Sequence, residues 1–260
     1  MEITLKEALN GKGTRIKDKD YFPTAAYVEP FVERLSKITK DFRIQVKLPD
    51  QVTKTKDGDI DLEDITFNRL WIQAVLPEEF NFYNHSEVIG MVYGLDVRKP
   101  VVKIYRGAIN NACTNLCVFN PSFLALQDLA PENPIDFTPV DTLLEYTDDT
   151  KSLLETLMNT EFDCQDREFI NERLGAWIRN CVHLHHTSDY GKVKIATSVP
   201  IDAYKSLFEN TNSKYYAGED PTTTMFNIYN AFTDIITNDG GKDIMNKIEK
   251  TLLLKRVLEL

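Results

Sequence analysis

The segment FRIQVKL, residues 42–48, alternates apolar and polar side chains, and this alternation predicts a half-buried β-strand. The next apolar run, ITFNRLWIQAVL at residues 65–76, predicts a second strand. Between the two runs, TKTKDGDIDLED at residues 53–64 contains Asp57-Gly58, a dipeptide typical of turns. The two strands are therefore expected to pair and to form part of an antiparallel sheet in the N-terminal half of the chain.

Other segments of the N-terminal half extend this prediction. Apolar residues at helical spacing predict a helix over residues 27–40, with Pro30 in its first turn. PVVKIYRGAI at 100–109 predicts a strand, and ACTNLCVF at 112–119 is either its continuation or a return strand. HSEVIGMVYGL at 85–95 is ambiguous, and the short-helix interpretation is preferred here.

The pattern changes after residue 139, where helical periodicity dominates. One further strand is expected at 192–198, and helices are expected at 141–160, 166–185, 199–210, 221–237 and 242–258. The sequence thus predicts an α+β protein, with a strand-rich N-terminal half built on an antiparallel sheet and a helix-rich C-terminal half. The expected organisation is a polar N-terminal arm (1–24), a sheet region (25–138) and a mainly helical region (139–260) packed on it as one compact unit.

Charge limits the classes of partner. The 260 residues include 40 acidic and 30 basic side chains, so the formal net charge is −10. A protein of this charge is repelled by phosphate backbones at long range, which argues against a whole-surface nucleic-acid binder and leaves room only for a local basic groove. The opening MEITLKEALNGKG lacks a signal-type apolar run, and no segment has the length of a membrane span. We expect a cytoplasmic protein with reduced thiols and no membrane contact.

One stretch reverses the sign of the charge. Residues 97–127 contain four cations and no acidic residue. Cations beside an aromatic ring are typical of single-strand nucleic-acid grooves. The candidate nucleic-acid-binding residues are Arg98, Lys99, Lys103, Tyr105, Arg106 and Asn115. The alternative is a central strand pair with solvated cations, in which Asn110, Asn111 and Asn115 shape a turn.

Motifs of known enzymes and of metal sites are weak in this sequence. It contains no phosphate-binding glycine loop ending in Lys-Ser/Thr, no HExxH and no Gly-x-Ser-x-Gly. Cys113 and Cys117, together with CVHLHH at 181–186, could offer zinc ligands, but buried core cysteines and a helix end capped by His183, His185 and His186 fit the pattern better. A non-enzymatic protein without metal or cofactor is expected.

Two stretches together resemble a known family. VVKIYRGAINNACTNL (101–116) and TTTMFNIYNAFTDIITNDGGKDIMNKIEKTLLLK (222–255) are similar to motifs of the phage/plasmid-like proteins grouped as domain of unknown function 932. The residues that match are Arg106, Cys113 and Asn115 in the middle motif and Tyr229, Asn230, Ala231 and Thr233 in the late one. The resemblance implies a mobile-element origin and a cytoplasmic site of action, and it implies no established activity.

The sequence is therefore compatible with two functions. The first is a phage-type single-strand nucleic-acid binding or annealing protein, which would assemble as a homo-oligomer. The second is an acidic interaction protein that binds and inhibits a host defence or nucleic-acid-processing protein, since a negative face can occupy a cationic channel. The arrangement of the cations at 98–106 distinguishes them. Convergence on an exposed strand face favours the first function, and dispersed or paired cations favour the second.

Overall fold

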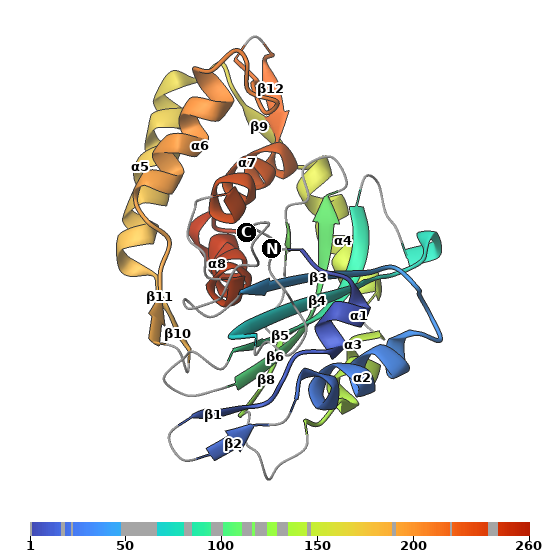
Figure 1. The fold of residues 1–260 in the computed structure, drawn as a ribbon. Helices are drawn as coiled ribbons and strands as arrows, with labels where there is room; N and C mark the ends of the chain where they lie inside the picture. Colours follow the sequence, from blue (N-terminus) through green and yellow to red (C-terminus); the bar gives the residue numbers. More distant parts are fainter. Residues whose placement is uncertain are drawn as a thin grey trace, which may run out of the picture. The chain divides into compact units, whose positions relative to one another are not determined.

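The computed structural model describes residues 2–16, 19–21, 23–47, 67–80, 85–94, 101–110, 116–117, 124–128, 135–144, 147–188, 191–218, 220–238 and 244–260 (Figure 1). The chain divides into two compact units. Unit 1 comprises Met1–Arg106 and Ser122–Glu145, and unit 2 comprises Gly107–Pro121 and Tyr146–Leu260. The boundary expected from sequence, between residues 138 and 139, thus falls within unit 1. The predicted turn segment at 53–64 lies outside the described residues.

A six-stranded sheet forms the framework of the N-terminal half, and this confirms the predicted α+β class (Figure 1). The strand order is β3-β4-β5-β6-β7, and β8 also pairs with β6. The predicted pairing of the first two strands is confirmed, because β3 and β4 are antiparallel with Phe42 opposite Ala74 and Lys47 opposite Arg69. The strands are β3 (Phe42–Lys47), β4 (Arg69–Val75), β5 (His85–Gly94), β6 (Val101–Asn110), β7 (Leu116–Cys117) and β8 (Leu124–Asp128).

Strand β6 pairs with different strands along its ten residues. Its first half, Val101 to Tyr105, pairs antiparallel with β8. The chain passes from unit 1 to unit 2 after Arg106. Beyond that point Ala108 and Ile109 pair with Cys117 and Leu116 of β7. The segment at 112–119 therefore contributes a return strand.

The predicted short helix at 85–95 is wrong, because this segment is strand β5. All ten of its residues are buried. A strand covered on both faces needs no alternation of polar and apolar residues, so its sequence cannot be distinguished from a buried helix by periodicity. The β-branched residues Val88, Ile89 and Val92 were the local indication of a strand.

Unit 1 carries its helices at α1 (Leu5–Leu9), α2 (Thr24–Leu35) and α3 (Thr138–Leu144), with a 3-10 turn η1 (Glu78–Phe80) and a hairpin of β1 (Thr14–Ile16) and β2 (Lys19–Tyr21). Helix α2 begins before residue 27, so Pro30 lies in its interior instead of its first turn. The N-terminal segment packs on its own unit: the Ile3 amide donates to the Ile44 carbonyl at 3.1 Å, and Glu2 forms a bridge with Gln45. This contact covers the free edge of β3, which would otherwise expose unpaired backbone groups.

Unit 2 is mainly helical, as predicted for the C-terminal half. Its helices are α4 (Thr147–Asn159), α5 (Arg167–His183), α6 (Ser198–Phe208), α7 (Met225–Asn238) and α8 (Ile244–Val257). Short strands β9 (Glu161–Asp163) and β12 (Thr222–Thr224) pair, as do β10 (His186–Ser188) and β11 (Gly191–Val193), so the strand expected at 192–198 is shorter than predicted. Fully buried Trp177 centres the core, with the Phe232 ring edge-on at 5.3 Å. No helix within the described ranges is long and apolar enough to cross a membrane.

Candidate functional site

The structure places the predicted nucleic-acid residues of β6 in the interior. Lys103, Tyr105 and Arg106 each have 0 % of their surface exposed. The other three candidates, Arg98, Lys99 and Asn115, lie outside the described residues. The described part of the predicted basic strand is therefore part of the core of the sheet, and its cations are buried instead of solvated.

Arg106 is held by a buried ion pair. Its Nη2 group contacts the Glu87 carboxylate of β5, and both side chains are fully buried. Its Nη1 group donates to the backbone carbonyl of Leu143 in α3. A charge can be removed from water only when it is paired and hydrogen-bonded, and this arrangement provides both. The guanidinium thus ties α3 to the sheet, and it is directed away from any nucleic-acid ligand at the surface.

Tyr105 is engaged in the same sheet. Its hydroxyl accepts hydrogen bonds from Trp71 Nε1 and, at 2.8 Å, from Gln73 Nε2, both on β4. Burial raises the pKa of the Tyr105 hydroxyl well above its ordinary value of 10. A ring enclosed in this way offers no face for base stacking, which is the role that the sequence assigned to it.

The cysteines with described side chains are free and buried. Cys164 follows β9, and Cys181 lies in α5. Burial raises the pKa of the Cys181 thiol to about 11, so this thiol is protonated near neutral pH. Cys113 lies outside the described residues, and His183 is an exposed residue at the end of α5. Within the described ranges, no group of three His, Cys, Asp or Glu side chains is arranged to hold a metal ion.

Exposed carboxylates lie on three neighbouring segments of unit 2, namely β9, the start of α5 and the residue before Pro221 that β9 pairing brings close. We call this surface the acidic face and define it as Glu161, Asp163, Asp166, Glu168, Glu172 and Asp220, all of which are exposed. Strand β9 has an exposed–buried–exposed pattern, so its two acids share one side. The start of α5 follows, and the β9–β12 pairing brings the segment before Thr222 beside Asp163.

Local structure fixes the acidic face in place. The Asp166 carboxylate caps α5 by accepting from the amides of Glu168 and Phe169, each at 3.0 Å. The Asp163 carboxylate accepts from the Gln165 amide at 2.8 Å and shapes the turn between β9 and α5. Glu168 and Glu172 are one turn apart on α5 and therefore lie on the same side of this helix.

Sequence reasoning did not single out the acidic face. The signal was present: residues 161–172 contain five acidic side chains and a single base, Arg167. That composition resembles the solvated surface of an ordinary helix, and only the fold shows that Asp220, far along the chain, joins the same surface. Charge density along the sequence was therefore informative, but the assembly of the face depends on the β9–β12 pairing.

Comparisons with known proteins add no constraint on the site: no family model, no curated protein and no solved structure matches this chain. The resemblance to the phage/plasmid-like family stays a prediction from the two motifs. Of the residues of the late motif, Tyr229, Asn230, Ala231 and Thr233 are buried in α7. In this structure their position is that of core residues.

Proposed function

We propose that this protein is a non-enzymatic interaction protein that binds a basic surface of another protein through the acidic face. The observation that carries the proposal is the burial of Lys103 and Arg106, the latter paired with Glu87. These were the two cations expected inside the nucleic-acid groove, and the two expected at its edge, Arg98 and Lys99, lie outside the described residues. Paired and buried cations are the arrangement that favours the acidic interaction protein over the single-strand binding protein.

The charge balance of the interior supports the same choice. The buried acidic and basic residues of the described part are Glu87, Glu249, Lys103 and Arg106, two of each formal sign. Removing them from the surface leaves the formal charge of −10 on the rest of the chain. Such a surface repels phosphate and attracts cationic channels, and complementary charge speeds association with the latter.

A protein that normally binds nucleic acid is the class of partner that this chemistry fits. Carboxylates held by a helix cap and by the turn between β9 and α5 present acceptors to Arg and Lys side chains that otherwise contact phosphate. Occupying those side chains would block the partner's nucleic-acid site. The resemblance to mobile-element proteins adds the expectation that the partner is a cytoplasmic host protein.

The test uses two variants of equal charge. The face variant carries Glu161→Gln, Glu168→Gln, Glu172→Gln and Asp220→Asn, and it leaves the structural carboxylates of Asp163 and Asp166 intact. The control variant carries Glu29→Gln, Glu78→Gln, Glu79→Gln and Glu209→Gln, which are exposed residues elsewhere. Each variant loses four negative charges, so −10 becomes −6 in both.

Immobilised wild type and both variants are incubated with bacterial lysate treated with nuclease, and captured proteins are quantified by mass spectrometry. We expect a nucleic-acid-binding protein that the wild type and the control variant capture and the face variant loses. The interaction should weaken as salt rises and should be displaced by added single-stranded DNA. Equal capture by both variants, or no salt-sensitive capture by the wild type, would overturn the proposal.

A further inference from the structure

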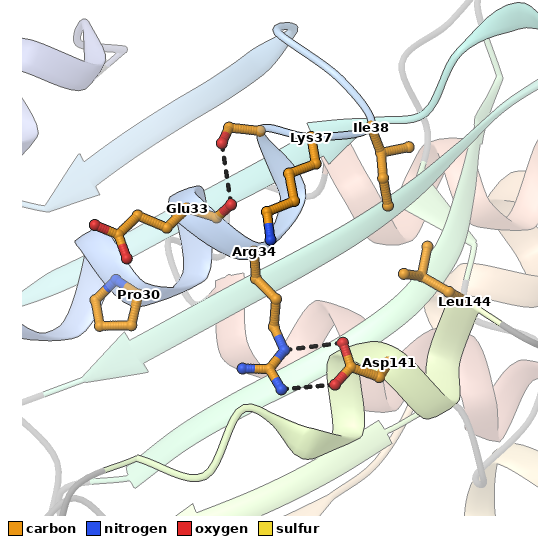
Figure 2. A pocket seen from close by; sticks show the side chains of 8 residues that line it. Pro30, Glu33, Arg34, Lys37, Ile38, Asp141 and Leu144 are labelled. Atoms are coloured by element: carbon orange, nitrogen blue, oxygen red, sulfur yellow. Dashed lines mark hydrogen bonds and ion pairs between the residues drawn. The ribbon is translucent and has the colours of Figure 1, made fainter.

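Unit 1 contains a surface pocket of about 840 Å³ between α2 and α3 (Figure 2). This volume is in the range of small-molecule sites. The residues that line the pocket are Pro30, Glu33, Arg34, Ser36, Lys37, Ile38, Asp141 and Leu144. They combine two cations with an apolar wall, which distinguishes this pocket from the acidic face of unit 2.

Arg34 is oriented in the pocket by Asp141. Its Nε and Nη2 groups donate to the two carboxylate oxygens of Asp141 at 2.9 and 2.6 Å, in a two-point fork (Figure 2). This hydrogen bonding lowers the pKa of Asp141 and raises the pKa of Arg34, so the pair stays ionised. The remaining group, Nη1, has no hydrogen-bond partner among the described residues. A guanidinium held in this way is pre-organised to donate to a further anion.

Lys37 adds a second cation, three residues after Arg34 and just beyond the end of α2. Its ammonium points toward Arg34 in Figure 2, and within the described residues it forms no ion pair or hydrogen bond. Neither of the nearby acids, Asp136 and Glu33, pairs with Lys37 in the described structure. The charge of Asp136 helps to raise the pKa of Arg34, and the Asp136 carboxylate accepts a hydrogen bond from the Thr138 amide at 2.9 Å. The Glu33 carboxylate is turned away from Asp141 (Figure 2).

We propose that this pocket binds a small ligand that joins an anionic group, a carboxylate or a phosphate, to an apolar body. Arg34 Nη1 and Lys37 Nζ take the anion, and the side chains of Pro30, Ile38 and Leu144 contact the apolar part. This inference is independent of the proposed function, because it concerns unit 1 and the acidic face lies in unit 2.

The test is isothermal titration of the full chain with phenyl phosphate and, separately, with benzoate. These probes share an apolar ring and differ in the anion, so the tighter of the two identifies the preferred group. Lys37→Met keeps most of the apolar stem and removes the charge. Lys205→Met, at an exposed residue of α6 in unit 2, is the matched control.

We expect saturable binding of at least one probe, weakened about tenfold by Lys37→Met and unchanged by Lys205→Met. Arg34→Gln should abolish binding, and circular dichroism will show whether that variant keeps its fold. Absence of binding by the wild type at millimolar probe would overturn the proposal. So would binding that both lysine variants weaken equally, since that result indicates non-specific attraction.

Discussion

The ring of Tyr105 lies over Gly90, in the space that any side chain at that position would occupy. A Cβ atom built on Gly90 would come within 2.6 Å of Tyr105 Cε1 and closer still to Cζ and the hydroxyl oxygen. Gly90 is opposite Gln73 in the β4–β5 register. The absence of a side chain at Gly90 therefore lets the tyrosine of β6 cross β5 and reach its hydrogen-bond donors on β4.

Replacing Gly90 with alanine should destabilise the protein by about 1–3 kcal/mol, because the new methyl group displaces a fully buried ring. Urea unfolding followed by circular dichroism measures the change. Gly175→Ala in α5 is the control: its Cβ would meet only the flexible end of Arg179 at 3.3 Å. Alanine there should be neutral or stabilising by up to about 1 kcal/mol. Equal effects of the two substitutions would contradict the close packing of Tyr105 on Gly90.

Tyr105→Phe removes the acceptor for Trp71 Nε1 and Gln73 Nε2. Leaving the buried Gln73 donor without this acceptor should cost about 1–3 kcal/mol of unfolding free energy. Tyr204→Phe provides the comparison, because Tyr204 is a partly exposed residue that packs on Phe208 with its ring. If loss of the Tyr105 hydroxyl were as harmless as loss of the Tyr204 hydroxyl, the buried hydrogen bonds would be absent in solution.

Arg106→Met tests the burial of the predicted nucleic-acid cation. Removing one partner of a buried ion pair should cost about 3–5 kcal/mol, since the Glu87 carboxylate loses its guanidinium partner. The double variant Glu87→Gln/Arg106→Met should recover part of this loss, and equilibrium unfolding of the wild type, Glu87→Gln, Arg106→Met and the double variant gives the coupling energy. A solvent-exposed arginine in a nucleic-acid groove would instead show little change in stability and no coupling to Glu87.

His85 at the start of β5 should make stability depend on pH. Burial lowers the pKa of its imidazole from 6.5 to about 4, so the native state holds it neutral. Between these values the unfolded state binds a proton that the native state does not. The stabilisation is therefore complete above pH 6.5 and is lost as pH falls toward 4, with a decrease of about 2 kcal/mol between pH 7 and pH 5.

The measurement for His85 is the unfolding free energy at pH 7 and pH 5 for wild type, His85→Gln and His183→Gln. Substituting His85 should reduce the pH dependence, because the group responsible no longer titrates. Substituting the exposed His183 should leave the wild-type dependence. The same pH dependence in all three proteins would mean that His85 does not titrate differently in the folded state.

The sequence predicted the fold class and most elements, and its failures have physical causes. The strand at 42–48 was found because burial of one face alternates polar and apolar residues, and the strand at 65–76 was found as a short apolar run, which matches its largely buried side chains. Strand β5 was missed because burial of all ten residues removes that alternation. The helix at 166–185 was predicted within two residues of its observed ends, and its start was marked by a capping aspartate, Asp166.

The candidate site was harder to predict than the fold. Charge runs show which residues are basic, but they do not show which acids lie across the sheet. The ion pair of Arg106 with Glu87 joins residues on neighbouring strands, and no local sequence pattern predicts it. The acidic face likewise needs Asp220 beside β9, a neighbour that only the β9–β12 pairing provides.

The most direct test of the account is fluorescence anisotropy with two labelled probes, a single-stranded oligonucleotide and an oligo-arginine peptide, each titrated with the purified protein at low and moderate salt. We predict that the peptide binds, that salt weakens this binding, and that the face variant binds less tightly than the control variant of equal charge. We predict no binding of the oligonucleotide. Salt-sensitive binding of the oligonucleotide, with no preference of the peptide for the acidic face, would contradict the proposed function.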